Sequence, residues 1–191
     1  FNKKGYKYTF SINAETAKYT NDTKQLIVFG NQVINLNYSS TLNMVKYGAS
    51  AQISKDYLKE KLSLSLGARM DGNNYSTSMS NPLKQLSPRF SAKYKLADKW
   101  SLLFNTGMYY RLPAYTSLGY RDKDGVLVNK NNDIKYIGVS HLVGGLQYDY
   151  TENVLFTLEG FSKQYTNYPF SVKDSISLAN LGADYGIIGA E

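Results

Sequence analysis

The sequence predicts an all-β fold, an antiparallel up-and-down transmembrane β-barrel segment that contributes about seven to eight strands to a larger barrel. Three observations predict it. Apolar and polar residues alternate with a period of two over long segments, long and short connections follow one another in turn, and one phase of the strands excludes charge. The composition agrees, since 18 Tyr, 8 Phe and 15 Gly among 191 residues favour strands and turns.

The first expected strand covers residues 4–13. One phase is apolar or aromatic and the other polar, in the order Tyr6, Lys7, Tyr8, Thr9, Phe10, Ser11, Ile12 and Asn13. A long, turn-rich connection is expected from 14 to 40. It contains an apolar island at 26–29, and residues 31–36 after it are compatible with a short hairpin inside the loop.

The next two strands form an expected hairpin. Alternation resumes at Thr41, runs through Tyr47, Ala49, Ala51 and Ile53, and meets a short turn at 56–59. Residues 62–71 give the cleanest strand, with Leu62, Leu64, Leu66, Ala68 and Met70 on one face. A polar loop rich in Asn, Ser and Thr follows at 72–86.

The strongest hairpin signal lies between Ser87 and Arg111. Each arm alternates strictly, and a tight turn at 97–99 separates the arms. Each arm has roughly the nine to eleven residues that a tilted strand needs to cross a bilayer. Soluble sheets usually have strands of about five or six residues, so length favours a membrane protein.

The remaining chain repeats this plan. A long connection at 112–137 leads to a strand at 138–150, a short turn at 151–153 and a strand that runs from Val154 to about Tyr165. A last long connection at 166–182 precedes a strand that begins near Ala183. Such alternation of long and short connections is typical of outer-membrane barrels, which have short periplasmic turns and long extracellular loops.

Charge supports the same fold. None of the apolar-phase positions assigned to these strands is Asp, Glu, Lys or Arg, whereas charged residues make up 19% of the chain. A lysine or arginine that faces lipid at the bilayer midplane costs roughly 2–4 kcal/mol. A soluble β-sandwich would show the same one-sided pattern with the apolar phase as its core, so this observation alone leaves the sandwich open.

Other features exclude several classes of protein. No run of about 18 apolar residues could form a membrane helix, the first residues lack the layout of a signal peptide, and the chain has no cysteine for disulfides. The net charge of +7 comes from scattered lysines, which argues against nucleic acid as a partner. With one histidine, His141, we expect no metal site, no cofactor and no enzyme.

Several segments, in this order, resemble TonB-dependent outer-membrane receptors, especially those of Bacteroidetes. They are Leu66-Gly67-Ala68-Arg69-Met70-Asp71, Leu86-Ser87-Pro88-Arg89-Phe90-Ser91, Lys99-Trp100-Ser101-Leu102, Tyr109-Tyr110-Arg111-Leu112-Pro113, Leu142 to Tyr150, and Leu158-Glu159-Gly160-Phe161. The resemblance covers about residues 60–170. It implies the bacterial outer membrane, a barrel of 22 strands with an N-terminal plug, and energy-coupled import through TonB.

On this basis residues 1–191 are expected to form a partial outer-membrane barrel domain, from which the plug and the remaining strands are absent. Expected partners are outer-membrane lipid, TonB through the missing parts, a small-molecule or glycan ligand such as a siderophore, and a surface lipoprotein. The alternatives are a porin-like or adhesive barrel without a plug, and a soluble carbohydrate-binding β-sandwich.

Candidate ligand contacts are inward-phase residues near the long connections and residues of those connections. Arginine can pair with carboxylate or phosphate oxygens, and tyrosine can stack on planar faces. The residues are Arg69, Asp71, Tyr109, Arg111, Tyr115, Tyr120 and Arg121.

Overall fold

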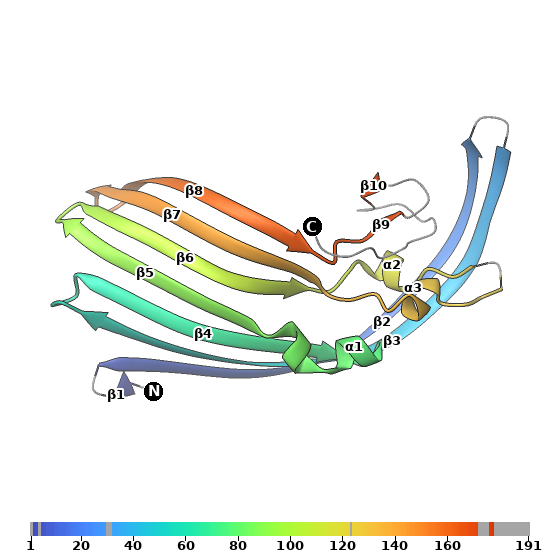
Figure 1. Ribbon diagram of the computed structural model, residues 1–191, viewed down its shortest axis with the longest axis horizontal. Coiled ribbons are helices and arrows are strands. Elements are labelled where there is room, and N and C mark those ends of the chain that lie inside the picture. Colours follow the sequence, from blue (N-terminus) through green and yellow to red (C-terminus); the bar gives the residue numbers. More distant parts are fainter. Residues whose placement is uncertain (1, 4, 30–31, 123, 172–175, 178–191) are drawn as a thin grey trace.

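A computed structural model describes residues 2–3, 5–29, 32–122, 124–171 and 176–177. Their main feature is an antiparallel sheet in which each strand pairs with its neighbours in sequence (Figure 1). Its strands are β1 (Asn2–Lys3), β2 (Tyr6–Phe29), β3 (Gln32–Tyr57), β4 (Leu62–Asn73), β5 (Ser87–Ala97), β6 (Trp100–Arg111), β7 (Ile137–Thr151) and β8 (Val154–Thr166). The predicted up-and-down fold is therefore confirmed, with seven long strands and the very short β1.

The predicted alternation of connections is confirmed from β3 to β8. Along this part of the chain, short connections lie at one end of the sheet and long ones at the other (Figure 1). The first short turn was predicted at 56–59 but comes later, at residues 58–61, where Leu58, Lys59 and Glu60 adopt positive φ. The short turns predicted at 97–99 and 151–153 contain only two residues each, 98–99 and 152–153. They are shorter because the pairing register shifts by one residue at Leu96 and at Tyr150, just before each turn.

The largest error of the sequence prediction concerns residues 14–40. They were expected to form a loop, yet β2 and β3 stay paired without interruption from Tyr6 opposite Lys55 to Phe29 opposite Gln32. This hairpin extends well past Lys46, where the pairing of β3 with β4 ends, and it bends away from the sheet (Figure 1). Strands can pair through their backbones without alternating apolar residues where they do not face lipid. The polar sequence of residues 14–25 therefore gave no period of two from which these strands could be predicted.

The long connections contain short helical turns that the sequence had not indicated. Between β4 and β5 lie α1 (Thr77–Ser80) and η1 (Pro82–Gln85), and between β6 and β7 lie α2 (Tyr115–Leu118) and α3 (Val128–Asn131). After β8, the two-residue strands β9 (Phe170–Ser171) and β10 (Ile176–Ser177) pair with each other. The strand expected near Ala183 lies outside the described residues. Among the described residues, no helix has the length and hydropathy to cross a membrane.

The two faces of the sheet differ in character and in curvature. On the polar face, a hollow of about 450 Å3 is lined by residues of five successive strands, from Lys7 of β2 to Asn105 of β6, so this face is concave. On the opposite face the apolar phase is open, with Leu66 57% and Leu158 75% exposed. A sheet with a bare apolar convex face and a polar concave face has the pattern of a barrel wall.

Lys55 is an exception on the apolar face. The charge pattern holds for the residues from which it was drawn, but β3 continues past Ile53, the last of them, and Lys55 in the same phase lies opposite Leu64. Its Nζ lies 3.9 Å from the ring centroid of Tyr6 and 5.1 Å from that of Tyr57. The ammonium group sits close to the short-turn end, where long basic side chains can reach the polar interface.

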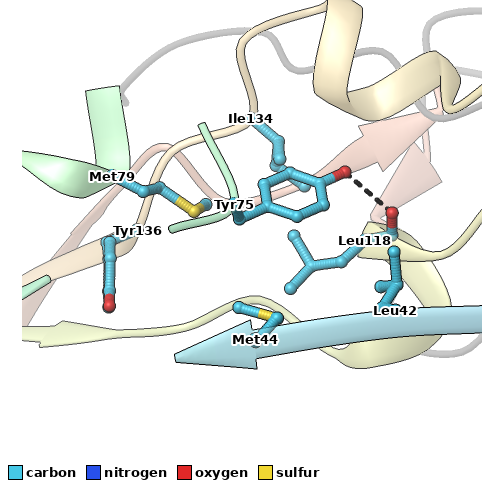
Figure 2. Packing of buried hydrophobic residues seen from close by; sticks show 7 residues of the cluster. All are labelled: Leu42, Met44, Tyr75, Met79, Leu118, Ile134 and Tyr136. Carbon is cyan, nitrogen blue, oxygen red and sulfur yellow. Dashed lines mark hydrogen bonds between the residues drawn. The ribbon is translucent and has the colours of Figure 1, made fainter. Parts of the chain in front are cut away.

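The buried core lies not in the sheet but where the long connections meet the β2–β3 hairpin. We call this region, formed by residues 74–86 and 112–136 with the facing residues of β2 and β3, the loop cluster. Figure 2 shows its side chains converging from β3 and from the two long connections. The core residues are Leu42, Met44, Tyr75, Met79, Leu118, Ile134 and Tyr136.

Several buried polar groups in and beside the loop cluster are paired, whereas the Ser40 hydroxyl and Asn129 Oδ1 have no hydrogen-bond partner among the described residues. The hydroxyl of Tyr75 donates to the carbonyl oxygen of Leu118 at 2.7 Å (Figure 2). The side-chain amide of Asn73 donates to the Tyr136 hydroxyl at 2.9 Å, and the Asn129 amide donates to the Ser117 carbonyl at 2.8 Å. Burial of a polar group is costly without such partners, so these bonds allow the long connections to pack tightly.

Candidate functional site

The polar face carries a row of aligned residues near the long-connection end. Arg89 of β5 lies opposite Gly67 of β4 on one side and Gly107 of β6 on the other. A Cβ atom at Gly107 would come within 3.2 Å of both Cα and Cγ of Arg89, and within 2.9 Å of the Pro88 carbonyl oxygen. Glycine at 107 therefore leaves the space through which the Arg89 side chain crosses β6.

Arg89 uses this space to reach Tyr109. Its guanidinium carbon lies 4.5 Å from the centroid of the Tyr109 ring, within range of a cation–π contact. The ring of His141, on β7, lies 4.9 Å from that of Tyr109 on its neighbouring strand. The next residue in the row is Lys163 of β8, which pairs with His141. Together these residues form a basic and aromatic wall across four strands.

Arg69 and Asp71, both predicted contacts, lie on the same face of β4 and form an ion pair. Nε and Nη2 of Arg69 donate to the two carboxylate oxygens of Asp71, each at 2.7 Å. The side chains are 39% and 19% exposed. This bidentate pair uses both acceptors of Asp71 and neutralises most of the charge of Arg69, whereas Arg89 has no such carboxylate partner among the described residues.

Arg69, Arg89 and Tyr109 line one hollow of about 240 Å3. Its other polar lining consists of hydroxyl and amide groups, from Ser50, Gln52, Ser65, Ser91 and Asn105. Tyr109 also lines a second hollow of about 420 Å3, together with Arg111, Tyr165 and Tyr168. The predicted contacts Tyr109 and Arg111 thus share the second hollow. Tyr109 lines both hollows, the first together with Arg89 and the second together with Arg111.

The remaining predicted contacts belong to the loop cluster. The ring of Tyr115 stacks on that of Tyr19 at 5.6 Å and an interplanar angle of 16°. Lys46 lies 5.8 Å from the Tyr115 ring centroid and forms an ion pair with Glu15 at 2.7 Å. Tyr115 is half-buried, which leaves part of its surface accessible.

Tyr120 and Arg121 have mainly structural contacts. Tyr120 is only 5% exposed, and its ring packs edge-on against Tyr38 with centroids 5.6 Å apart. The Arg121 guanidinium donates to the carbonyl oxygen of Gly125 at 2.6 Å and so closes the turn between them. The structure does not bring these two residues to the wall around Arg89, and their role in ligand binding stays a prediction.

Sequence reasoning did not name three residues of the wall as ligand contacts: Arg89, His141 and Lys163. The search for ligand contacts favoured residues near the long connections, and Arg89 lies at the third position of β5. The available signal was the pair Gly67 and Gly107, because glycine within a strand often marks a close approach of another group. Only the cross-strand register shows that Arg89 lies between them.

The described residues show no group of three or more His, Cys, Asp or Glu side chains that could hold a metal ion. The wall is instead built from guanidinium, ammonium, imidazole, phenol and amide groups. These groups can hold oxygen atoms and planar rings by hydrogen bonds, charge and stacking.

Comparison with known families identifies the architecture. Residues 2–189 match the model of the family described as TonB dependent receptor-like, beta-barrel. The chain belongs to this family. As a TonB-dependent receptor barrel segment it lies in the bacterial outer membrane, and its family is one of receptors and not of enzymes. The alternative of a soluble carbohydrate-binding β-sandwich is therefore wrong.

A solved structure supports the fold of this receptor segment. The chain is similar to a protein titled "Copper transporter OprC", with a TM-score of 0.61 and 20% sequence identity over 89% of this chain. At that identity the likeness concerns the fold alone. The chain spans 29% of the length of that transporter. No curated protein matches the sequence.

Membership of the family assigns the two faces of the sheet in this receptor segment. The convex apolar face meets lipid, and the concave polar face, with the wall around Arg89, lines the inside of the barrel. The loop cluster lies at the end of the long connections, which in outer-membrane barrels is the extracellular end.

Proposed function

We propose that the chain is part of the barrel wall of a TonB-dependent receptor that imports a scarce ligand by gated, energy-coupled transport. The family match over residues 2–189 carries this proposal. The polar concave face supports it, because a transport path through a membrane needs a surface that tolerates water and polar solutes. Candidate ligands are a siderophore, a glycan or a similar nutrient.

The proposal extends to parts of the receptor beyond residues 1–191. A plug domain would fill the barrel, TonB would act on the receptor through segments outside this chain, and further strands would close the sheet. Among the described residues, β2 beyond its two pairs with β1 has no further strand on its outer edge, and β8 has none on its outer edge. These edges support further strands, since unpaired backbone groups are very costly in lipid. The resemblance to receptors of Bacteroidetes leads us to propose a receptor of that type, with a surface lipoprotein as a further partner.

Within this wall we propose that ligand contacts include Arg69, Tyr109 and Arg111, which line the two hollows next to Arg89. Asp71 would act through Arg69, which it orients by its two hydrogen bonds. Tyr115, Tyr120 and Arg121 are proposed as contacts of the extracellular loop cluster, among which the half-buried Tyr115 has more accessible surface than Tyr120.

Two measurements on the full-length receptor test energy-coupled import. In planar lipid bilayers, a receptor that is closed by a plug should give no lasting conductance, and the receptor should bind the isolated periplasmic domain of TonB. A permanently open channel, or a receptor that does not bind TonB, would instead indicate a passive porin-like or adhesive barrel and would contradict the proposal.

A further inference from the structure

We infer that the wall around Arg89 is a binding site for an anionic ligand group, a carboxylate or a phosphate, with Arg89 as its main contact. This inference rests on the proposed function, because it assigns the chemical class of ligand to the barrel interior. It goes beyond that function, since TonB-coupled import alone does not determine whether the ligand is charged.

The first argument is the balance of charge on this part of the wall. The two ion pairs among the described residues join Glu15 to Lys46 and Arg69 to Asp71. Arg89 belongs to neither pair, and the same holds for Arg111 and Lys163. Asp71, the acidic residue on the neighbouring strand, has both oxygens engaged with Arg69. The surroundings of Arg89 therefore have an excess of positive charge.

The second argument is the way in which Arg89 is held. Its guanidinium carbon lies 4.5 Å from the ring centroid of Tyr109, and the missing side chain at Gly107 makes this approach possible. A contact of a guanidinium group with the face of an aromatic ring restricts its movement while N–H donors at its edge stay available. Such a fixed fork suits two oxygen atoms of one carboxylate or phosphate group.

The third argument is the space beside this fork. The hollow of about 240 Å3 that contains Arg69 and Arg89 is lined by neutral donors and acceptors from Ser50, Ser65, Ser91 and Asn105. On the other side of Tyr109, Arg111 lines the larger hollow with Tyr165 and Tyr168. An anionic group at Arg89 would thus have room for a polar or planar body that extends along Tyr109.

The experiment uses the full-length receptor in detergent and measures calorimetric binding of three probes: citrate for carboxylates, pyrophosphate for phosphates and sucrose as a neutral control. We expect saturable binding of citrate or pyrophosphate and none of sucrose. Arg89→Gln should weaken anion binding about tenfold to a hundredfold, the usual range for a charge-assisted hydrogen-bonded contact. The stronger of the two anions identifies the preferred group.

The matched control is Lys95→Gln, which removes a cation from the same face of the same strand near the short turn, away from the wall. It should leave anion affinity unchanged. A second variant, Tyr109→Leu, keeps all charges but removes the platform of Arg89, and should weaken binding by less than Arg89→Gln. Correct folding of each variant is checked by its electrophoretic mobility before and after heating.

The inference is overturned if neither anion binds, if Arg89→Gln binds anions as the unaltered receptor does, or if Lys95→Gln loses as much affinity. These outcomes differ from failure of the proposed function. If the receptor binds TonB and is closed but does not bind anions, the transport proposal stands and the anion-site inference is wrong. If the receptor binds anions through Arg89 but forms an open channel, the anion-site inference stands and the transport proposal is wrong.

Discussion

Met79, Leu118 and Ile134 in the loop cluster are fully buried, whereas Leu66 and Leu158 in the membrane sheet of the same chain are 57% and 75% exposed. The loop cluster lies in water and has to shield its apolar side chains within the protein. The sheet lies in lipid and turns its apolar side chains outward, so it needs no internal core. One chain therefore uses two opposite solutions to the placement of apolar residues.

The two regions also differ in how they satisfy polar groups. In the sheet, the backbone groups pair between neighbouring strands through the ladder from β2 to β8. In the loop cluster, side chains take over part of this task, as the Asn74 side chain accepts from Val45 N–H at 2.9 Å and the Asn129 side chain donates to the Ser117 carbonyl. Single substitutions in the loop cluster should consequently change its local stability, whereas substitutions on the lipid face of the sheet should change the stability of the receptor in the membrane.

The largest effect is expected from Leu118→Ala in the loop cluster. Removal of a fully buried leucine side chain leaves a cavity and should cost about 2–5 kcal/mol of local stability. Hydrogen exchange of the full-length receptor should become faster in residues 74–86 and 112–136 but not in β4 to β8. Leu83→Ala is the control, because Leu83 is 69% exposed on η1 and its loss should change little. Equal exchange in both variants would mean that the loop cluster has no core.

A charge on the lipid face should have the next largest effect. Leu66→Arg places a cation in the middle of β4 toward lipid and should destabilise the folded receptor by about 2–4 kcal/mol. Urea titration of the receptor folded into phospholipid vesicles measures this loss. Ser65→Arg is the matched control, since Ser65 is the adjacent residue and lies on the polar face. If the two variants lost the same stability, the assignment of the two faces would be wrong.

The contrast between the regions explains which elements could be predicted from sequence. Within lipid, every second residue of a strand must be apolar, so a period of two marked β4 to β8 clearly. Outside lipid this requirement ends, and the polar residues 14–25 concealed the extension of β2. The predicted island at 26–29 and the residues after it do pair, but as the far end of one long hairpin and not as a separate one.

The core of the loop cluster could not be predicted, because its members are far apart in sequence. Leu42, Tyr75 and Leu118 come from three connections or strands, and no local period relates them. The candidate site shows the same limit. Tyr109 and Arg111, and likewise Arg69 and Asp71, could be chosen because they lie in the inward phase near the end of a strand that leads into a long connection. Arg89 required the register of three strands.

Tyr75→Phe should have the smallest of the three effects and tests whether polar pairing holds the loop cluster together. It removes the hydrogen bond that the hydroxyl donates to the Leu118 carbonyl at 2.7 Å, at a cost of about 1 kcal/mol. Hydrogen exchange in residues 112–136 of the full-length receptor should rise modestly. Tyr165→Phe, in which the changed ring is 45% exposed, should leave this exchange unaltered.

The buried hydroxyl of Tyr75 should make the stability of the loop cluster depend on pH in the alkaline range. Burial raises the pKa of Tyr75 well above its ordinary value, and burial also raises the pKa of Tyr136. Above pH of about 10 the unfolded phenols lose protons that the folded ones retain, so stability should be constant below that pH and fall above it. Tyr75→Phe should reduce this fall without abolishing it, because Tyr136 remains. An identical alkaline fall in both proteins would show that Tyr75 ionises freely and is not held inside the core.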